Sequence, residues 1–414
     1  MTLTPFLPFS PFSISRRHVL RSAAAGGLSA WAGLSLGGQG EAGGKRMVFC
    51  ILRGGMDGLF TVPAVGDPAF EAARGTLGRY ATPVLPLQGP FALHPALVQM
   101  HAMYGAGELA VVHAVGQAYH DRSHFDAQQV LESGGTLPYQ MKDGWLGRAL
   151  RLTGRPGIAL NTAVPLVVRG SDQVDTWAPS ALPDPSADLL VRLGRMYAAD
   201  PQLAAALSRA QSMRVGEEMP ASAKSGGEMG GAKMDGGKRG GIVALATQAA
   251  RFLAQARGPQ IAVLDMSGWD THYGEDGPKS PFVEQLRQLD GALAALRDNL
   301  SAPAADGAWR RTVVVVATEF GRAVEINGTH GTDHGNGSAA FVLGGAVQGG
   351  RVLADWPGLA KAQRFEGRDL AVTTDLRAVF KGVLRDHLGL ASASLDQAVF
   401  PDSAAIKPLA LIRS

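Results

Sequence analysis

Residues 312–337 read TVVVVATEFGRAVEINGTHGTDHGNG and join an expected strand to a loop of ligand-type side chains. The first five residues are β-branched, which is typical of a strand buried on both faces. The loop that follows contains five glycines and these charged residues and histidines: Glu319, Arg322, Glu325, His330, Asp333 and His334. Enzymes of alternating strands and helices present metal or anion ligands in this way. A polar loop at a solvated edge is the alternative interpretation.

Three other segments repeat this pattern of an apolar strand followed by polar side chains. The expected strands are residues 47–52, 109–115 and 261–264, and the polar residues after them are Asp57, Ser123, Asp270 and His272. Amphipathic helices are expected between strands, notably over residues 281–300. The alternation predicts an α/β fold with a mostly parallel sheet flanked by helices on both faces. Ligands of such sheets gather at the carboxyl ends of the strands, so we expect the polar residues to converge on one site.

Composition limits the class of protein. The 46% of hydrophobic residues suits a protein with a sizeable core, and the 54 glycines indicate many loops and close backbone contacts. A net charge of +3 gives no sign of a surface for nucleic acid. Cys50 is the only cysteine, which excludes an intramolecular disulfide and a zinc site built from cysteines.

The N-terminal residues predict export. The sequence SRRHVLR at residues 15–21 precedes a short apolar stretch of small residues that ends near a candidate cleavage site, Ala30-Trp31-Ala32. This pattern predicts a twin-arginine signal peptide over residues 1–32, the twin-arginine translocation machinery as a partner, and a periplasmic or otherwise exported location. An ordinary secretory signal or a membrane anchor is the alternative. The stretch is short for a membrane span, so no stable span is expected after processing.

The remaining chain is expected to form one domain. Residues 33–44 are a Gly-rich spacer, and residues 45–414 form the α/β domain. Residues 213–241 are rich in Gly, Lys and Met and have no periodicity, which predicts a disordered low-complexity insertion. The order of elements over residues 150–210 stays open.

Carboxylates and imidazoles after the strands predict a site for a divalent metal ion. The candidate ligands are Asp57, Asp270, His272, Glu319 and His334. Such oxygen and nitrogen donors suit zinc, calcium or manganese. No pair has the spacing of a zinc finger or of an HExxH helix, and each residue alone is more often a turn or surface residue. The prediction therefore depends on their convergence.

Ser123 is the candidate nucleophile. At a helix start its hydroxyl meets unpaired N–H groups and the positive end of the helix dipole, which favour an anion or a developing alkoxide. Residues 123–126 also fit a structural capping box, which the local sequence favours. Arg122 and Arg322 could clamp a small anionic ester substrate or pair with surface acids. The GxSxG, P-loop and GxGxxG motifs are absent, which disfavours serine-hydrolase, NTPase and dinucleotide functions.

The motifs, in their order along the chain, resemble the DUF1501 family of exported bacterial proteins, which is related to the alkaline phosphatase and sulfatase superfamily. They are the leader, LRGGMDGLF at 52–60, DRSHFDAQQ at 121–129, LDMSGWDTH at 264–272, and TEFGR at 318–322 with NGTHGTDHGNG at 327–337. The resemblance covers nearly all of the mature chain. It implies an alkaline phosphatase-like fold and a metal-dependent hydrolase of phosphate or sulfate esters.

The resemblance also implies roles for single residues. Asp57 matches a metal-binding Asp after the first strand, and Ser123 matches the nucleophile at a helix start. Asp270 and His272 match the ligands of one metal.

For the other metal, Glu319 and His334 match two ligands, but Phe320 stands where the superfamily has a histidine. This difference leaves three outcomes open. The site could hold one metal, use a shifted ligand such as His330 or Asp333, or have lost catalysis.

Two functions of different classes follow from these observations. The first is an exported hydrolase that uses the metal site, and the second is an exported non-catalytic binding or assembly protein that retains the fold. Cys50 lies inside an expected strand, and no Cys-x-Pro-x-Arg motif is present, so a formylglycine-dependent sulfatase is disfavoured.

Overall fold

The first expected strand lies in the middle of a large sheet. The computed structural model of the chain describes residues 44–180, 185–215, 241–277 and 279–413. In it, β1 (Arg46–Arg53) pairs in parallel with β7 (Ile261–Ser267) on one side and with β8 (Thr312–Thr318) on the other. The β-branched run of the opening stretch is therefore a strand with every residue buried, as predicted.

The described residues form a nine-stranded sheet in which β9 runs antiparallel to its neighbours. The order is β10-β4-β9-β8-β1-β7-β5-β6, with β11 also paired to β4. β9 is antiparallel to β8 and β4, and the other described pairs of this sheet are parallel. The remaining strands are β4 (Leu109–Gly116), β5 (Gly157–Ala159), β6 (Val174–Thr176), β9 (Ser338–Leu343), β10 (Arg351–Leu353) and β11 (Thr374–Asp375), and a separate antiparallel pair is β2 (Leu85–Pro86) with β3 (Ala92–Leu93). The predicted mostly parallel sheet is confirmed.

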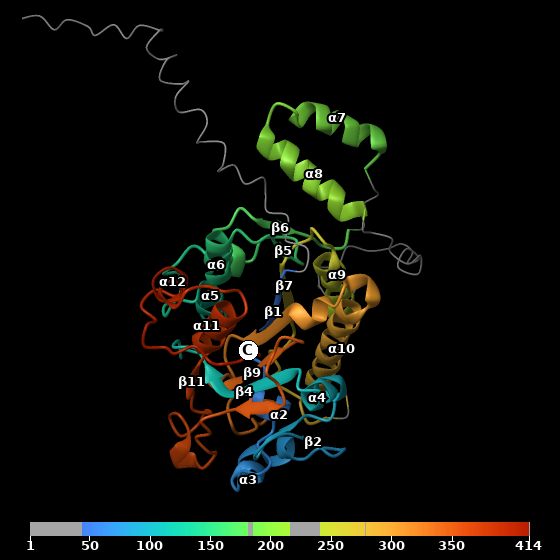
Figure 1. Cartoon of the computed structure of the whole chain (residues 1–414). Coiled ribbons are helices and arrows are strands. Elements are labelled where there is room, and N and C mark those ends of the chain that lie inside the picture. The colour runs from blue at the N-terminus through green and yellow to red at the C-terminus, as the bar shows by residue number, and fades with distance from the viewer. Residues whose placement is uncertain (1–43, 181–184, 216–240, 278, 414) are drawn as a thin grey trace, which may run out of the picture. The chain divides into compact units, whose positions relative to one another are not determined.

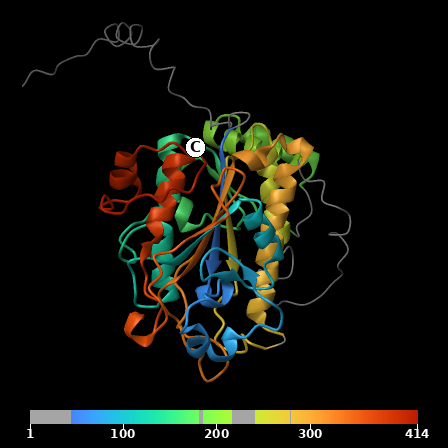
Figure 2. The ribbon, with the colours of Figure 1, turned by 60° about the horizontal axis from the view of Figure 1, so that its bottom comes forward.

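Helices cover both faces of the sheet (Figures 1 and 2). Alternate residues of β1 enter two cores: Met47, Phe49 and Ile51 enter one, and Val48, Cys50 and Leu52 the other. The core that contains Val48 is covered by α4 (Val98–Gly105), α9 (Ile242–Ala254) and α10 (Pro281–Ser301). The core that contains Met47 is covered by α5 (His124–Ser133), α6 (Trp145–Thr153) and α11 (Leu376–Asp386). Burial on both faces explains why this strand is apolar throughout.

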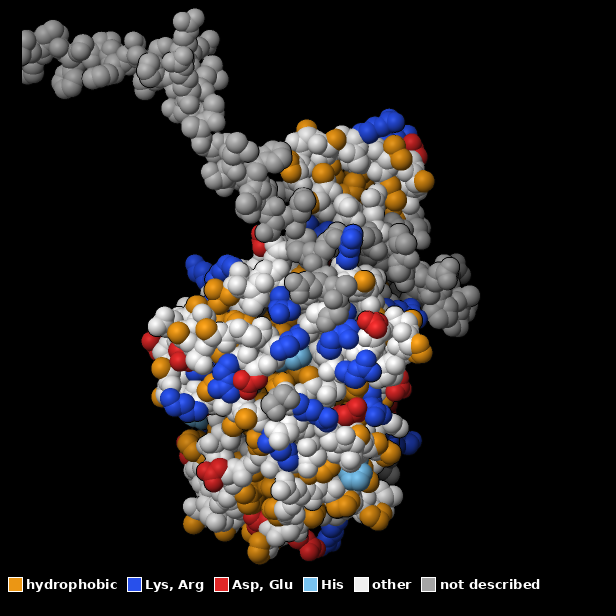
Figure 3. All heavy atoms as spheres, viewed as in Figure 1, with side chains coloured by type: hydrophobic (Ala, Val, Ile, Leu, Met, Phe, Trp, Pro, Cys, Tyr) orange, Lys and Arg blue, Asp and Glu red, His pale blue; other side chains and the backbone are white. Residues whose placement is uncertain are grey.

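The other helices are short or lie outside the two cores. They are α2 (Gly58–Thr61), α3 (Phe70–Arg74), α7 (Ala187–Tyr197), α8 (Pro201–Val215) and α12 (Ser392–Ser394). No residue of α7 is buried, and Leu189, Val191 and Met196 are exposed. Figure 3 shows apolar side chains on the surface of the α7–α8 hairpin. α7 therefore adds nothing to either core.

The predicted leader lies outside the described residues. The chain divides into Met1–Gly38 and Gln39–Ser414, and every described residue belongs to the second unit. The signal peptide and most of the spacer are thus untested, and export stays a prediction. Residues 216–240 of the predicted insertion also lie outside, whereas α8 extends to Val215, inside the range predicted to be disordered. No helix in the described part of the chain is long and apolar enough to cross a membrane.

A buried histidine of β4 makes stability dependent on pH. Nε2 of His113 donates to the carbonyl oxygen of Val62 at 2.8 Å, and its Nδ1 accepts from the N–H of Ala114 at 2.7 Å. Burial lowers the pKa of His113 to about 4. The unfolded chain takes up this proton first, so the free energy of unfolding should fall as pH drops from about 6.5 to 4. Above about pH 6.5 the contribution is constant.

We expect His113→Gln to weaken this acid dependence, because glutamine stays uncharged. The part of the unfolding free energy that depends on His113 is on the order of 3 kcal/mol between those two pH values. Urea unfolding of wild type and variant, in the presence of a chelator, measures it. Identical pH dependence in the two proteins would contradict the prediction.

Candidate metal centre

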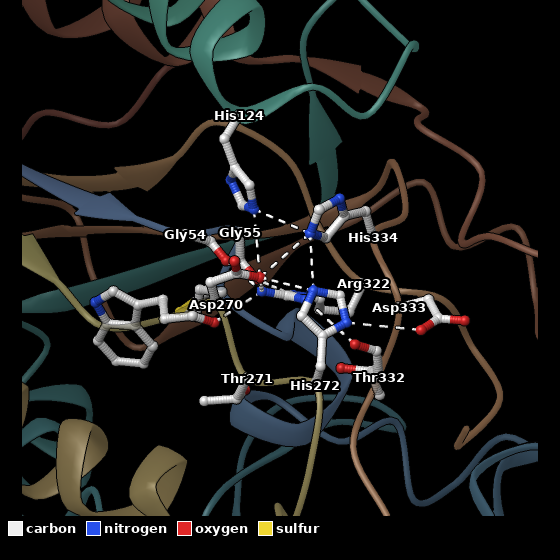
Figure 4. A network of polar contacts seen from close by, with 12 residues as sticks. Gly54, Gly55, His124, Asp270, Thr271, His272, Arg322, Thr332, Asp333 and His334 are labelled. Carbon is white, nitrogen blue, oxygen red and sulfur yellow. Dashed lines mark hydrogen bonds and ion pairs between the residues drawn. The ribbon is translucent and has the colours of Figure 1, made fainter. Parts of the chain in front are cut away.

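Four loops meet at the carboxyl edge of the sheet, where they follow β1, β4, β7 and β8. The loop after β4 leads into α5, whose first residue is His124. The loop after β7 carries Asp270 and His272, and the loop after β8 carries Arg322 and His334. These side chains point toward one another (Figure 4). The predicted convergence is thus found for three of the five predicted metal ligands.

The carboxylate of Asp270 lies among three imidazole rings. Its Oδ1 is 2.9 Å from Nε2 of His272, 3.2 Å from Nε2 of His334 and 3.3 Å from Nε2 of His124. Nε2 of His334 is also 3.0 Å from Nε2 of each of the other two rings. His124 and His272 lie on opposite sides of the Asp270–His334 pair (Figure 4). The cluster therefore consists of two triples that share Asp270 and His334.

These spacings fit the ligand atoms of a metal ion. Tetrahedral zinc with bonds of about 2.0–2.1 Å separates its ligand atoms by roughly 3.3 Å. In the triple of His124, Asp270 and His334, the three ligand atoms are 3.0, 3.2 and 3.3 Å apart. Three protein ligands leave a fourth position open, as in catalytic zinc sites. Imidazole and carboxylate donors suit zinc or manganese, whereas calcium takes oxygen ligands and fits this set poorly.

The second nitrogen of two rings faces a fixed hydrogen-bond acceptor. Nδ1 of His124 is 2.8 Å from Oε1 of Glu319, and Nδ1 of His334 is 3.1 Å from the carbonyl oxygen of Arg122. A proton held on Nδ1 leaves the lone pair of Nε2 free. Metal-bound histidines have this arrangement, in which the outer partner fixes the tautomer and the ring orientation.

The surroundings of the three ligands shift their pKa values in different directions. Burial, with the positive charges of Arg322 and His124, lowers the pKa of His334. Burial alone would lower the pKa of His124, but Glu319 and Asp270 outweigh it and raise that pKa. Burial would raise the pKa of Asp270, yet the hydrogen bond and charge of Arg322 hold it well below its usual range. The site thus combines a neutral imidazole, an ionised carboxylate and a histidine that readily takes up a proton.

The guanidinium of Arg322 ties the loops together beneath the cluster. Its side chain is buried, and it donates to the carbonyl oxygens of Gly54, Gly55, Trp269 and Thr332. Nη2 of Arg322 also donates to Oδ1 of Asp270 at 2.7 Å. All three nitrogens are occupied by protein groups. The prediction that Arg322 clamps a substrate anion is therefore wrong, because the group is a buried structural centre.

Two glycines after β1 let this loop reach Arg322. Gly54 and Gly55 have φ values of +122° and +67°, which favour glycine. A Cβ atom on Gly54 would lie 2.4 Å from the backbone nitrogen of Asp270, and one on Gly55 would lie 2.6 Å from the ring of Phe320. Both positions need glycine for conformation and for space.

Glu319 supports a ligand instead of being one. Its buried Oε1 accepts from Nδ1 of His124 at 2.8 Å, from the N–H of Gly54 at 2.8 Å and from Nε2 of Gln128 at 3.1 Å. Burial would raise the pKa of Glu319, but these hydrogen bonds lower it. The structure places its carboxylate on the far side of the His124 ring from Asp270. This position corrects the prediction that Glu319 is a direct ligand.

Asp57 also lies outside the cluster. It accepts from the N–H of Phe60 at 2.9 Å, as the N-cap of α2, and pairs with the fully buried guanidinium of Arg74. Arg74 donates further to the carbonyl oxygens of Ala323 and Val324. Asp57 therefore balances a buried charge, and the structure does not bring it to the predicted ligands.

Arg122 contributes its backbone to the site. Its φ of +59° is unusual for a side-chain-bearing residue, and its carbonyl oxygen accepts from His334. Its guanidinium donates to Asp369 at 2.9 Å and to Glu366 at 2.7 Å. The predicted role as an anion clamp is not supported, because two acids already pair with this charge.

Ser123 occupies the N-cap position of α5 without capping the helix. Its side chain accepts no hydrogen bond from the first turn, so the capping box that the local sequence favours is absent. The half-buried hydroxyl interacts with the phenol of Tyr119 instead. Ser123 therefore stands next to His124 with no capping role.

Phe320 packs against the ligands where the resemblance implies a histidine. Its ring centroid is 4.7 Å from that of His124 and 5.2 Å from that of His334. The ring is buried and forms an apolar wall beside the cluster. Phe320 therefore shields one side of the two imidazoles and supplies no ligand atom.

His124 is the site residue that the sequence prediction missed. The sequence pattern assigns a nucleophile to Ser123 and predicts no role for the residue after it. The signal was its position: a helix that begins at the end of β4 exposes its first turn at the edge where Asp270 and His334 lie.

The sequence matches one family model. The model described as "Protein of unknown function (DUF1501)" matches residues 111–397. This range contains His124, Asp270, His272 and His334, and it begins after β1. A search of the curated proteins gives no match.

Among solved structures the similarity is distant. The phosphonate monoester hydrolase of Agrobacterium radiobacter matches with 13% identity and a TM-score of 0.43, over 84% of this chain and 74% of that one. The lipoteichoic acid synthase LtaP from Listeria monocytogenes matches with 11% identity and a TM-score of 0.42, over 89% and 77%. The PsFucS1 sulfatase from Pseudoalteromonas sp. matches with 15% identity and a TM-score of 0.39, over 89% and 71%.

We expect Glu319→Gln to weaken metal binding by roughly 10–100-fold, because His124 loses the charged partner that orients it and raises its basicity. Titration calorimetry with Zn²⁺ at about pH 8, where protons compete little for the ring, measures the affinity. The control is Glu108→Gln, whose carboxylate pairs with Arg297 away from the cluster. Equal Zn²⁺ affinity in wild type and Glu319→Gln would show that this support is unimportant.

Asp57→Asn should destabilise the fold and leave metal affinity unchanged. Removing this charge leaves the Arg74 guanidinium buried and unpaired, so the free energy of unfolding should fall by about 3–5 kcal/mol. Adding Arg74→Met should restore part of the loss. Urea unfolding and Zn²⁺ titration test the two expectations. A fall in Zn²⁺ affinity as large as that of His334→Ala would instead make Asp57 a ligand.

Proposed function

The chain belongs to the DUF1501 family, whose description states no function, and from the site we propose that it is an exported metal-dependent hydrolase of phosphate or sulfate esters. One observation carries the proposal: three imidazole Nε2 atoms converge on Oδ1 of Asp270. Nε2 lone pairs that face each other at 3.0 Å repel, and a metal cation between them, or a proton on one ring, removes the repulsion. The class of ester comes from the resemblance of the motifs to the alkaline phosphatase and sulfatase superfamily.

The triple of His124, Asp270 and His334 would hold the metal ion. A divalent ion there would polarise the ester and lower the pKa of an attacking hydroxyl. The side chain of Asp270 is 46% exposed, so the cluster is open to a small substrate. Arg322 keeps this carboxylate ionised and fixed in place.

Ser123 would be the nucleophile. Because its side chain does not cap α5, the first N–H groups of this ten-residue helix lack that partner and can receive an anionic oxygen. The Ser123 hydroxyl would release its proton to solvent, and its oxygen would form a bond to phosphorus or sulfur as the bond to the leaving alcohol breaks. Water would then cleave the resulting serine ester and release the acid.

His272 would supply the proton to the leaving alcohol. It lies on the other side of the Asp270–His334 pair, and its side chain is 42% exposed. Its Nδ1 is 3.6 Å from the carboxylate of Asp333, which can orient the ring. This role differs from the ligand predicted from the sequence, although Nε2 of His272 lies close enough to Asp270 to serve as one.

A non-catalytic binding protein is the second candidate. Arg122 and Arg322, the two predicted anion clamps, are both paired within the protein. Phe320 also fills the place of an expected ligand. A protein of this class would bind metal through the same triple, and its function would not need Ser123.

We expect Ser123→Ala to abolish ester hydrolysis while leaving stability and metal content unchanged. Loss of a nucleophile should lower kcat by roughly 10³-fold or more. The matched control is Ser280→Ala: Ser280 accepts from the N–H of Val283 as a true cap, so its removal should cost stability of about 1 kcal/mol without loss of activity. Aryl phosphate and aryl sulfate serve as substrates, and elemental analysis gives the metal content.

Three results distinguish the candidates. Metal at one ion per chain with Ser123-dependent hydrolysis supports the hydrolase. Metal without hydrolysis of either ester favours the binding protein, whereas metal-dependent hydrolysis that survives Ser123→Ala overturns only the assignment of the nucleophile. Protein that takes up no metal would exclude both uses of the triple.

A further inference from the structure

A buried acid beneath the cluster, Glu275, has no role in the chemistry proposed above. It is 1% exposed. Its Oε1 accepts two hydrogen bonds, from Oγ1 of Thr271 at 2.7 Å and from Oγ1 of Thr332 at 2.8 Å. Its own N–H donates to the carbonyl oxygen of His330 at 2.7 Å. A single carboxylate oxygen thus joins two loops of the chain.

These two loops carry the ligands. Thr271 lies between Asp270 and His272, and Thr332 lies two residues before His334. A shift of either hydroxyl relative to Glu275 would therefore move a ligand of one loop relative to a ligand of the other. The positions of the metal ligands depend on the register of the two loops at this point.

Side chains near the surface add further links between these loops. The side chains of Asn327 and Thr329 both donate to the carbonyl oxygen of His272, at 3.0 and 2.6 Å. The N–H of Thr332 reaches the carbonyl oxygen of Thr271 only at 3.5 Å. Exposed hydrogen bonds exchange with water, whereas the pair at Glu275 is buried, like the bonds of Arg322 to the carbonyl oxygens of Trp269 and Thr332.

The second carboxylate oxygen of Glu275 stays without a partner. Oε2 has no hydrogen bond within the described residues. Burial, together with the charge of Asp57, raises the pKa of Glu275 to about 7. A buried acid with one orphaned oxygen is costly to the fold, so the two hydrogen bonds that its other oxygen accepts have to offset that cost.

We propose that Glu275 is a positioning residue that holds the two ligand loops in the register required for metal binding. This inference rests on the proposed function, since it presupposes that the triple binds a metal ion. Glu275 touches neither metal nor substrate and acts through Thr271 and Thr332. An amide oxygen can accept the same two hydroxyl hydrogen bonds, so Glu275→Gln should preserve the register, whereas Glu275→Leu should lose it.

The test measures Zn²⁺ affinity in the metal-stripped full chain by titration calorimetry. Glu275→Leu should bind Zn²⁺ roughly 10–100-fold more weakly than wild type, as for other residues that orient metal ligands. Glu275→Gln should stay within about twofold of wild type. The matched control is Asp290→Leu, which removes a buried carboxylate that accepts from the N–H groups of Gln99 and Met100. It should lower the melting temperature and leave Zn²⁺ affinity unchanged.

If Glu275→Leu does not fold, the pair Thr271→Val and Thr332→Val removes the same two hydrogen bonds with little change in shape. This double variant should show the same loss of affinity. The inference is overturned if these variants bind Zn²⁺ as wild type does, or if Glu275→Gln binds as weakly as Glu275→Leu. It is also overturned if Asp290→Leu loses as much affinity, since the effect would then reflect stability alone.

The inference and the proposed function fail in different ways. Wild type that binds Zn²⁺ with affinity indifferent to Glu275 overturns only the positioning role. Wild type that binds no Zn²⁺, Mn²⁺ or other divalent ion overturns the metal site and the positioning role with it.

Discussion

The buried guanidinium of Arg322 is the contact on which the site depends. A charge removed from water needs an opposite charge and full hydrogen bonding, and Arg322 finds both in Asp270 and in four backbone carbonyls. Those carbonyls belong to the loops after β1 and β7 and to the segment before His334. One side chain therefore fixes three separate parts of the chain, and the same ion pair keeps the central carboxylate ionised. The imidazoles converge because the hydrogen bonds of Arg322 fix the loops that carry them.

Most of the sheet could be predicted from the sequence because its central strands are buried on both faces. Runs such as residues 47–52 and 312–316 have few alternatives to a buried strand, and the stripe of α10 follows from its helical period. The segment from 150 to 210 resisted prediction because β5 and β6 are three-residue strands and α7 has no buried face. The antiparallel direction of β9 could not be predicted either, because the residues of a strand do not indicate whether the neighbouring strands run parallel or antiparallel to it.

The site was predictable in its location and less so in its assignments. Asp270 and His334 follow strands that end at one edge, so their meeting follows from topology. Which side chain reaches the centre depends on its direction: Glu319 directly follows a buried strand and meets the outer nitrogen of His124, whereas His124 opens a helix and points into the cluster. The guanidinium of Arg122 pairs with acids that lie almost 250 residues away in the sequence, and no local pattern reveals such partners.

The antiparallel strand β9 has a consequence for the stretch at residues 312–337. Because β9 runs opposite to β8, the chain that leaves the sheet after Thr318 re-enters it at the same edge, at Ser338. A parallel strand would have required the chain to cross to the far edge first, and a helix would have separated the end of β8 from the next strand. The reversed strand instead anchors both ends of the loop that bears His334 in the sheet itself. Both ends of the loop are therefore fixed by neighbouring strands of the sheet. No crossover helix has to pack against the sheet before His334 reaches the cluster.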